Sequence, residues 1–506
     1  MELYLRGHDY RYAVEQMLLT LFPGQRPGYP EGEPDGSSPS LLLSLEEDDR
    51  ELTAQAVLWW EGKVHTSRRK ADASELTGGL ADDRVRQRIL RLAFYDAGVA
   101  ALGHEPPWGA LTGVRPVKLP TRRMASGAGR EEAKEQLIQV YRVSRDRAEL
   151  AMDCAETALR VRQGLTRDSL SLYLGVPFCP TRCAYCSFIS SDVKGSAALI
   201  GPYVEALCRE IQVAGALLRE RGWHISTAYM GGGTPTTLPA EGLDRVLSAM
   251  EEHLPMDRCV ETTVEAGRPD TITREKLEAL KAHRVHRISI NPQTMEDSVL
   301  RTMGRAHTAA QIEQAMELAD RWFGGLVNMD LIAGLPTDTP EGFRRTLERV
   351  LAMDPANITV HTLALKKGSR LTEEGGALCA PEEVSAMLEL AGGRLRGAGY
   401  GPYYLYRQKY MSGSFENVGW AKPGTVCAYN VIMMEELQSV LSLGAGGITK
   451  LVDPDTGKIV RLANPKYARE YLEGWDKVAA GKRTAVDIQA RSMRKGEKAE
   501  KVERNT

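Results

Sequence analysis

The 506-residue sequence has few of the features that would place it at a membrane, on nucleic acid or outside the cell. No apolar run approaches the roughly 20 residues that span a bilayer. The first six residues mix acid and base and do not form a signal peptide. Lys and Arg (65) nearly balance Asp and Glu (67), for a net charge of −2, so there is no basic footprint for nucleic acid. We therefore expect a cytoplasmic protein with neither a membrane nor a nucleic-acid partner.

Cysteine is scarce and mostly scattered. Five of the eight cysteines stand alone, which does not suggest a disulfide framework: Cys154, Cys208, Cys259, Cys379 and Cys427. The other three, Cys179, Cys183 and Cys186, follow the spacing Cys-x3-Cys-x2-Cys. Three thiolates hold three corners of a four-iron cluster and leave one iron open. An open iron can chelate the amino and carboxylate groups of S-adenosylmethionine (SAM), and an electron passed to the sulfonium then releases a 5′-deoxyadenosyl radical.

Zinc is the alternative occupant of these cysteines. Structural zinc sites are coordinated by four ligands, which usually come from two pairs of residues that lie far apart in the sequence. Here an isolated residue such as Cys208 or His224 would have to supply the fourth ligand. The spacing therefore favours the cluster.

Beyond residue 170, short apolar runs alternate with helical stretches. Six strands are predicted, and helices separate them, with a last helix at 381–398; the strands cover 171–176, 225–230, 260–265, 286–290, 325–332 and 357–363. Such alternation predicts an α/β fold with a parallel sheet. Six units fall short of the eight of a closed barrel, so we expect a partial (β/α)6 barrel.

The rest of the chain divides around this barrel. We expect an α+β domain of unassigned role over 1–165, with strands at 41–45 and 54–60 and helices at 82–102, 130–143 and 146–164. The barrel would cover 166–400. A C-terminal extension, 401–486, would complete the substrate and cofactor pocket. The charged tail, 487–506, is expected as a frayed helix or a disordered segment.

Polar residues follow successive strands of the predicted barrel. The second strand ends in three glycines, 231–233, then Thr234; Glu265 ends the third, Gln293 follows the fourth, and Asp330 lies in the fifth. The carboxyl ends of parallel strands meet at one edge, so we expect these residues on one rim with the cysteines. The glycines would let the backbone approach a ligand closely. No Lys-Ser/Thr pair follows them, so phosphate binding is not indicated.

These motifs, in this order, resemble those of the radical SAM proteins. The elements that carry the resemblance are the cysteine loop, GGGTPT at 231–236 and VEAGRPD at 264–270. NPQ at 291–293, GRAHT at 304–308 and DLIAGLP at 330–336 narrow it to the oxygen-independent coproporphyrinogen III oxidases. The N-terminal region, with WGALTGVRP at 108–116, is similar to the HemZ branch of that group.

The resemblance implies roles for matching positions. Cys179, Cys183 and Cys186 would ligate a [4Fe-4S] cluster. Four residues would contact the cluster-bound SAM: Tyr173, Gly232, Glu265 and Ile448. A second SAM molecule would contact Tyr185, Gly233, Thr234, Gln293, Arg305, Asp330 and Ala364. The implied partners are a tetrapyrrole substrate and a low-potential electron donor such as flavodoxin or ferredoxin.

The implied reaction is the oxidative decarboxylation of coproporphyrinogen III to protoporphyrinogen IX, an oxidoreductase step of porphyrin and heme biosynthesis. Two propionate side chains would become vinyl groups. A substrate with four carboxylates needs cationic anchors. The candidates are Arg305, Lys366, Lys367, Arg370, Arg407 and Lys409, although solvated surface charge explains the last five equally well.

Three departures from the group's pattern leave other functions open. Ser187-Phe188 stands where these oxidases often carry a further cysteine. Gly175 stands where they frequently have a histidine. Residues 427–434 replace the His-Asn-x2-Tyr-Trp element that is usual in the group. Heme-trafficking relatives also lack the extra cysteine. A heme-binding carrier is therefore the alternative function, with Cys427, His361 or His307 as an axial ligand. A third reading is a radical enzyme that acts on another tetrapyrrole or on an unrelated carboxylate.

Overall fold

The computed structural model describes residues 1–506 except 37–38, 188–190, 377, 410 and 504–506, and it leaves the side chains of 80, 194, 412 and 494–503 undescribed. The chain forms two compact units. Unit 1 is Met1–Met152 with Arg407–Phe415, and unit 2 is Asp153–Tyr406 with Glu416–Thr506. The predicted boundary at 165 therefore falls inside unit 2, and a short segment from the C-terminal half joins unit 1.

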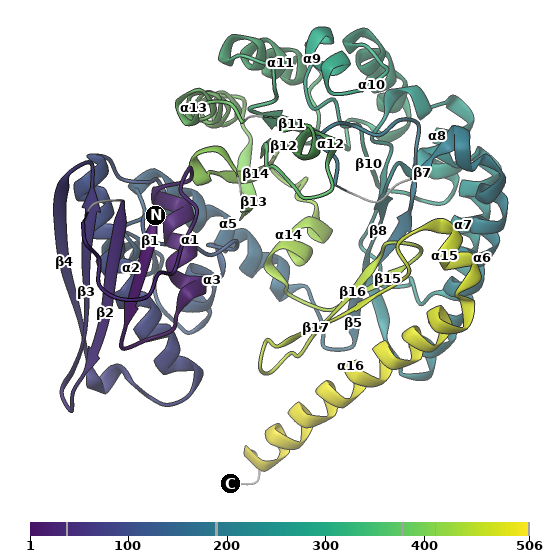
Figure 1. Cartoon of the computed structure of the whole chain (residues 1–506). Coiled ribbons are helices and arrows are strands. Elements are labelled where there is room, and N and C mark those ends of the chain that lie inside the picture. The colour runs from purple at the N-terminus through teal and green to yellow at the C-terminus, as the bar shows by residue number, and fades with distance from the viewer. Residues whose placement is uncertain (37–38, 188–190, 377, 410, 504–506) are drawn as a thin grey trace. The chain divides into compact units, whose positions relative to one another are not determined.

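Unit 1 is built on a four-stranded sheet with the order β1-β2-β3-β4 (Figure 1). The strands are β1 (Glu2–Arg6), β2 (Ser40–Glu47), β3 (Glu51–Trp60) and β4 (Lys63–Asp72). β1 runs parallel to β2, and β2, β3 and β4 form an antiparallel meander. The sequence indicated β2 and β3. It missed β4 because KVHTSRRKAD is almost wholly polar, although this strand pairs along its whole length with β3.

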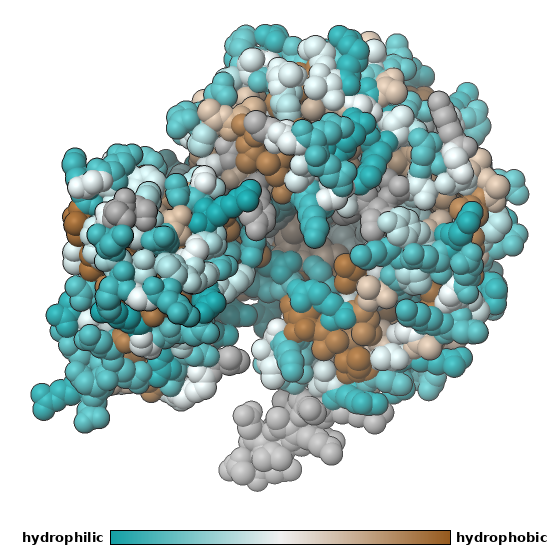
Figure 2. Space-filling model, in the orientation of Figure 1, coloured by the Kyte–Doolittle hydropathy of each residue, from teal (hydrophilic) through white to brown (hydrophobic). Residues whose placement is uncertain are grey.

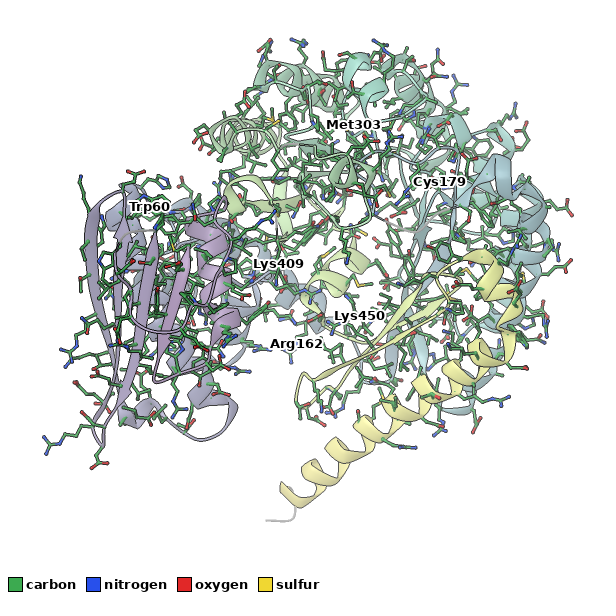
Figure 3. The ribbon with its side chains drawn as sticks, in the orientation of Figure 1. Trp60, Arg162, Cys179, Met303, Lys409 and Lys450 are labelled. Atoms are coloured by element: carbon green, nitrogen blue, oxygen red, sulfur yellow. The ribbon has the colours of Figure 1, made fainter. Side chains whose placement is uncertain are left out.

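Two helices give unit 1 its apolar core. α1 (Arg11–Leu21) and α2 (Leu80–Leu102) pack on the sheet and bury its alternate residues, among them Leu41, Leu43 and Leu58. Period-two burial is what a half-buried strand requires. Figure 3 locates Trp60 at the end of β3, where its ring lies 4.6 Å from that of Phe22.

The helices that follow depart from the prediction in one place. α3 spans Lys118–Ala125, and the predicted helix 130–143 divides into α4 (Arg130–Glu135) and a π-helical segment, Gln136–Val140. α5 (Arg145–Gln163) begins after Ser144, whose hydroxyl oxygen accepts a hydrogen bond from the Arg147 amide at 3.4 Å. This contact caps the start of the helix.

Unit 2 contains six parallel strands in the order β5-β8-β9-β10-β11-β12. Their bounds are β5 (Ser169–Val176), β8 (His224–Gly232), β9 (Glu261–Glu265), β10 (Arg287–Ser289), β11 (Val327–Ala333) and β12 (Asn357–Thr362). The predicted α/β fold with a partial (β/α)6 barrel is confirmed.

Later strands extend this sheet at both sides to eleven strands. β13 (Gly401–Arg407) and β14 (Glu416–Ala421) follow β12 in space, and β14 is antiparallel to it. β15 (Val440–Leu443) pairs in parallel with β5, and β16 (Ile448–Val452) and β17 (Ile459–Ala463) complete that side. Over the described residues, β13 and β17 end the sheet without pairing to each other, so the barrel is open.

Helices cover the outside of the curved sheet in unit 2 (Figure 1). The long ones are α6 (Val193–Glu220), α7 (Ala240–His253), α8 (Arg274–Ala282), α10 (Ala309–Phe323), α11 (Pro340–Ala352) and α13 (Pro381–Gly397). Short helices α9 (Asp297–Thr302) and α12 (Arg370–Glu373) lie in the strand-end loops, and α14 (Ala428–Glu435) contacts β8 from the inner face. α15 (Ala468–Glu473) and α16 (Trp475–Glu503) pack on α6.

Three further observations bear on the sequence predictions. Helix α16 continues to Glu503, through most of the segment expected as a frayed helix or a disordered tail. All eight cysteines are free of disulfides. Within the described part of the chain, no helix combines the length and the apolar character of a membrane span.

Candidate active site at the carboxyl ends of the parallel strands

Aromatic and polar side chains line the inner face of the sheet in unit 2. The register pairs Tyr173 with Tyr229, and Tyr229 with Thr263. The rings of Tyr173 and Tyr229 are stacked with centroids 6.4 Å apart, and Tyr429 of α14 stacks on Tyr229 at 4.7 Å. A packed barrel fills this position with Val, Ile and Leu. The polar lining here is instead typical of a face that binds a ligand.

Glu265 lies at the end of β9 beside this stack. The Tyr229 hydroxyl donates a hydrogen bond to its Oε1 at 2.7 Å. Burial raises the pKa of Glu265 to about 7; the nearby Asp330 carboxylate adds to this rise, while bonds from Tyr229 and the Gly232 amide oppose it. Glu265 is thus a carboxyl group that changes charge near neutral pH and would prefer a cationic neighbour.

The three glycines at the end of β8 are needed mainly because a Cβ there would clash with neighbouring protein atoms or because the backbone has a positive φ. A Cβ at Gly231 would lie 2.8 Å from Oε2 of Glu265, and one at Gly233 would lie 2.4 Å from the Phe178 carbonyl oxygen. Gly232 has φ +113°, which side-chain-bearing residues rarely adopt. The sequence attributed these glycines to close approach of a ligand, whereas the structure shows that two of them first allow β8 to pack against its neighbours.

The end of β8 also holds the start of the cysteine loop. The amide of Gly233 donates to the carbonyl of Val176 at 2.8 Å, and that of Thr234 donates to the carbonyl of Phe178 at 2.7 Å. The Thr234 hydroxyl then lies 3.5 Å from Sγ of Cys179. The second strand therefore fixes the first cysteine, as the predicted proximity of GGGTPT and the cysteines requires.

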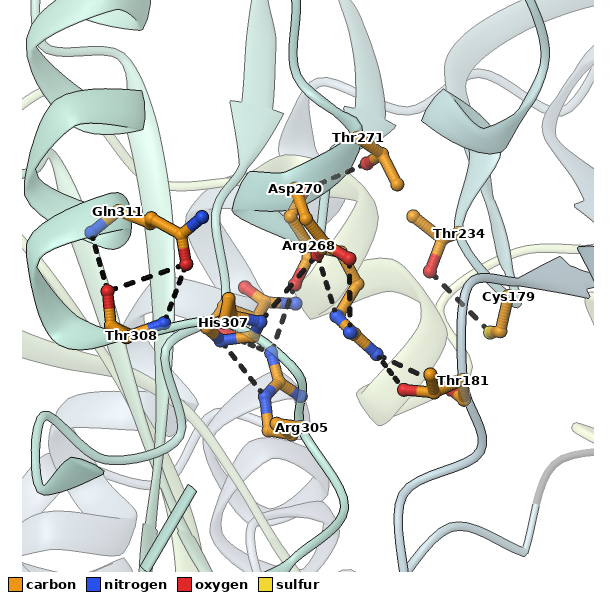
Figure 4. A network of polar contacts seen from close by, with 12 residues as sticks. Cys179, Thr181, Thr234, Arg268, Asp270, Thr271, Arg305, His307, Thr308 and Gln311 are labelled. Atoms are coloured by element: carbon orange, nitrogen blue, oxygen red, sulfur yellow. Dashed lines mark hydrogen bonds and ion pairs between the residues drawn. The ribbon is translucent and has the colours of Figure 1, made fainter. Parts of the chain in front are cut away.

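The loops after β9 and α9 brace the middle of the cysteine loop. Arg268 Nη1 donates to Thr181 Oγ1 at 3.0 Å, and this hydroxyl donates to the carbonyl of Gly304 at 3.1 Å. The amide of Ala184 donates to the carbonyl of Met303 at 3.0 Å. Figure 3 labels Met303 and Cys179, and Figure 4 shows the Arg268–Thr181 contact.

Arg305 ties the cysteine loop to the barrel with all five of its N–H groups. Nη1 lies 3.0 Å from the Tyr185 hydroxyl and 3.7 Å from Sγ of Cys183. Nη2 donates to the carbonyls of Gly267 and Asn291 at 3.3 and 2.6 Å, and Nε points to His307 at 3.4 Å. Burial raises the pKa of Tyr185, so its hydroxyl stays protonated.

An acid, an arginine and a histidine support this cluster from behind (Figure 4). Asp270 accepts from Nε of Arg268 at 3.1 Å and lies 3.6 Å from Nδ1 of His307. Burial would raise the pKa of Asp270, but His307 and Arg268 outweigh it and hold the pKa at about 2. Asp270 is therefore a fixed negative charge that holds the Arg268 guanidinium and lies beside His307, whose pKa burial lowers.

Gln293 is held by β11 in a strained conformation. Its φ is +68°, its amide donates to the carbonyl of Asp330 at 2.9 Å, and its carbonyl accepts from Ile332 at 3.0 Å. Such strain persists only where the surroundings impose it, and it is frequent at functional sites. The backbone contact explains how Gln293 and Asp330, distant in sequence, are brought together.

Besides Nδ1 of His307, four buried polar atoms of this region lack a hydrogen-bond partner among the described residues: Oγ1 of Thr263, Oδ1 of Asn291, Oε1 of Gln293 and the hydroxyl of Tyr429. Leaving a buried donor or acceptor unpaired costs about 1–3 kcal/mol. A ligand with N–H and O–H groups would pair them, and the amino, ribose and adenine groups of SAM are of this kind. The residues present therefore fit the molecule that the cysteine spacing implies.

Two predicted cofactor contacts lie at the periphery of this group. Ile448 is 48% exposed at the start of β16, and its carbonyl accepts from Ser442, the register partner of Tyr173. Ala364 is buried just after β12. The roles of all predicted SAM contacts stay predictions, while the structure places most of them on one rim.

The predicted substrate anchors divide into three groups. Arg305 is fully engaged with the protein, as described. Arg407 and Lys409 lie in unit 1: Arg407 donates to the carbonyls of Leu111 and Ser414, and Lys409 lies 4.6 Å above the ring of Tyr12. The donors of Arg305 and Arg407 already bind protein groups, so these contacts do not support the two as anchors, and that role stays a prediction.

The third group flanks the cysteine loop. Lys366 is partly buried, and burial lowers its pKa although Cys186 opposes the change. Lys367 and Arg370 are exposed. Sequence reasoning assigned no role to Tyr229, Arg268 or Asp270, and it considered His307 only as a possible heme ligand. The motifs VEAGRPD and GRAHT contain three of them, so the signal was present, but only the contacts reveal that they brace the loop.

Comparisons with known proteins agree with this geometry. Residues 173–350 match the Radical SAM superfamily model. The chain is 37% identical over 441 residues to the oxygen-independent coproporphyrinogen-III oxidase-like protein HemZ of Bacillus subtilis (strain 168), which covers 86% of this chain and 88% of that protein. It is 26% identical to the heme chaperone HemW of Escherichia coli (strain K12), over 60% of this chain and 76% of that protein.

Among solved structures, coproporphyrinogen III oxidase (HemN) from Escherichia coli matches with a TM-score of 0.51 and 24% identity, over 63% of this chain and 72% of that chain. The fold is therefore of the HemN type. The family model and the relative at 37% identity show that the chain belongs to the radical SAM superfamily. Within it, the chain belongs to the HemZ-like coproporphyrinogen-III oxidase-like proteins. Membership implies a [4Fe-4S] cluster and SAM.

Proposed function

We propose that this protein is an oxygen-independent coproporphyrinogen III dehydrogenase, an oxidoreductase that converts two propionates of its substrate to vinyl groups. One observation carries the proposal. The braced cysteine loop and the polar, partly unpaired inner face of the barrel lie at the same strand ends, next to an ionisable Glu265. The relative HemZ and the fold of HemN support a porphyrin-related substrate.

Cys179, Cys183 and Cys186 are proposed as the three cluster ligands, with SAM on the open iron. When bound, these groups supply the one-electron cleavage of an S–C bond that gives the 5′-deoxyadenosyl radical. Asp330, Gln293 and their neighbours in the second predicted set are proposed to hold a second SAM. Its cationic sulfonium and amino groups suit a rim that carries the carboxylates of Glu265 and Asp330.

The chain's own contribution is to orient the groups and to keep the reaction away from water. Arg305 and Arg268, which are 5% and 3% exposed, fix the cysteine loop through their side chains. The Tyr173–Tyr229–Tyr429 stack provides a rigid apolar wall with hydroxyl groups at its edges. A reactive carbon radical needs such a wall, because exclusion of solvent prevents side reactions.

Anaerobic product analysis tests the proposal. The reconstituted protein is incubated with reductant, SAM and coproporphyrinogen III, and Cys183→Ser serves as the control without a complete ligand set. We expect protoporphyrinogen IX and 5′-deoxyadenosine from the wild type and neither from the variant. Formation of 5′-deoxyadenosine without any vinyl product would keep the radical chemistry and overturn the substrate.

The HemW relatives raise a second candidate, a heme carrier. Of its three potential axial ligands, Cys427 is fully buried and donates to Oε1 of Glu261 at 3.1 Å, and His307 is buried against Arg305 and Asp270. His361 stays partly exposed, beside Tyr406 at 3.2 Å. Heme titration separates the candidates: a saturable Soret shift that His361→Ala abolishes would favour the carrier, and no shift would eliminate it.

A further inference from the structure

Cationic residues concentrate on the elements that clasp the cysteine loop. Three stretches are involved: 179–187, 298–305 and 364–371. Together they contain six Lys or Arg residues, and four acids flank them: Glu296, Asp297, Glu373 and Glu374. Glu296 pairs with Arg345 at 2.8 Å and Asp297 accepts from the Ala309 amide at 2.8 Å, so the charge within the three stretches themselves is positive.

The three stretches are neighbours in space as well as in composition. The amide of Leu371 donates to the carbonyl of Ala184 at 2.8 Å, and Arg182 Nη2 donates to the carbonyl of Gly368 at 2.5 Å. A Cβ at Gly304 would lie 3.1 Å from Nη2 of Arg370, so this guanidinium lies directly over the turn that binds Thr181. The cations therefore surround one loop.

Two of the six have functions inside the protein, and four face the solvent. Arg305 is buried, and Lys366 is partly buried beside Cys186. The exposed ones are Arg182, Arg301, Lys367 and Arg370. Glu374 of the following turn pairs with Arg370 at 3.5 Å, which leaves the other three as the main source of positive field. Figure 2 shows hydrophilic side chains gathered over α12, where this surface begins.

We propose that Arg182, Arg301 and Lys367 form a docking surface for an acidic one-electron carrier protein, the donor that the cluster chemistry requires. The carrier's reduced cofactor loses one electron and the cluster gains it, so that no proton or atom is exchanged. Complementary charge accelerates such encounters and makes them salt-dependent. Arg182 lies on the loop that carries the cluster ligands, and the segments of Arg301 and Lys367 are hydrogen-bonded to that loop, so docking there would bring the carrier close to the cluster.

The proposal goes beyond decarboxylation and does not depend on the tetrapyrrole, because the readout is SAM cleavage. The probe is a reduced flavodoxin with an acidic surface, and dithionite is the small-molecule comparison. For Arg301→Glu with Lys367→Glu, we expect donor-driven 5′-deoxyadenosine formation to fall by about tenfold or more at low salt. Dithionite-driven formation, measured without a tetrapyrrole so that a substrate-anchoring role of Lys367 does not enter, should change less than about twofold. The wild-type donor-driven rate should fall steeply as salt is raised.

Arg321→Glu is the matched control, an exposed arginine in the last turn of α10, at the opposite end of that helix from the site. It should leave both rates unchanged. Isothermal titration with oxidised flavodoxin supplies a readout independent of turnover, and binding should weaken in the double variant and not in the control. Equal losses with both reductants, or unchanged binding and rates in the double variant, would overturn the docking surface. Absence of vinyl product would overturn only the substrate proposal.

Discussion

Two buried regions of unit 2 each contain a glutamate, and their surroundings are opposite. Glu210 of α6 is fully buried and receives four donors: the Gly444 amide, Asn464, Tyr471 and Lys482, at 2.6 to 3.1 Å. Glu265 receives two donors, the Tyr229 hydroxyl and the Gly232 amide, and lies near a second carboxylate, Asp330. A buried carboxylate that accepts hydrogen bonds from many protein donors stabilises the fold. A buried carboxylate with few protein donors can still accept hydrogen bonds from a ligand.

The hydrogen bonds around Glu210 connect α16 to the strand ends beside the site. Lys482 of α16 also donates to the carbonyl of Ser442 at 2.7 Å, and Ser442 pairs with Tyr173 of the site. A Cβ at Gly444 would lie 2.3 Å from the carbonyl oxygen of Gly175. The network therefore fixes the end of β5 and the glycine-rich turn before Ile448, and it supports the rim without touching it.

Lys482→Met should give the largest effect. It leaves Glu210 as an uncompensated buried charge, which costs about 3–5 kcal/mol. Denaturant unfolding of the full chain measures the loss. Lys477→Met, at an exposed position of the same helix, should change stability by less than about 0.5 kcal/mol. A loss below about 1 kcal/mol for Lys482→Met would show that the network is not structural.

Tyr471→Phe should follow. The substitution removes one donor to the Glu210 carboxylate, at 2.6 Å, and a hydrogen bond to a charged group contributes about 1.5–3 kcal/mol. The same unfolding assay checks this value. In the Lys482→Met background the loss should differ from the loss in wild type, because the two side chains share one acceptor. Strict additivity would contradict a shared network.

Glu265→Gln should have a pH-dependent effect. The pKa of Glu265 is raised from its ordinary 4.5 to about 7, mainly by burial. The folded chain therefore binds an extra proton between these values, so this group's contribution to stability is complete below pH 4.5 and is lost as the pH rises through 7. Above pH 7 the variant should be more stable than wild type by up to about 3 kcal/mol, and near pH 4.5 the two should agree.

The control for this profile is Glu317→Gln, an exposed glutamate of α10. Its stability should follow the wild-type pH dependence throughout. If the stability of Glu265→Gln also followed the pH dependence of the wild type, the pKa of Glu265 would not be raised. The contrast with Glu210 would then fail.

Tyr429→Phe should cause no loss of stability. Its hydroxyl is buried without a hydrogen-bond partner among the described residues, so its removal should leave stability unchanged or raise it, by at most the roughly 1–3 kcal/mol that an unpaired buried group costs, while the stack on Tyr229 is retained. Measured beside Tyr471→Phe, it compares two buried tyrosines that differ in whether the hydroxyl is paired. Equal losses for the two variants would contradict the distinction between the regions.

The sequence was sufficient for the parallel part of the fold and for the cysteine loop. Buried parallel strands are continuous apolar runs between helices, and 171–176 or 327–333 are easy to recognise for this reason. The cysteine spacing is itself a chemical signature, and the strand-end argument correctly brought Thr234 to Cys179 and Gln293 to Asp330. In both cases the signal is local and the geometry of a parallel sheet supplies the rest.

Long-range polar contacts could not be predicted in this way. Lys482 lies in a charged helix that reads as a solvated surface, yet it is 2% exposed, because its partner Glu210 comes from the other end of unit 2. Arg407 is similar: its charge suggested a substrate anchor, and only the structure shows that it caps the loop at Leu111. The polar strand β4 was also not predictable from its own residues. The same holds for the strands that extend the sheet of unit 2 at both sides, because their pairing depends on residues far away in the sequence.

Isotope transfer is the most direct test of the central claim, that a radical formed at these strand ends attacks a propionate. Coproporphyrinogen III deuterated at the β-carbons of its propionates is turned over anaerobically, and the 5′-deoxyadenosine is examined by mass spectrometry. The account predicts deuterium in 5′-deoxyadenosine together with vinyl product. Unlabelled 5′-deoxyadenosine and an unchanged porphyrinogen would contradict it.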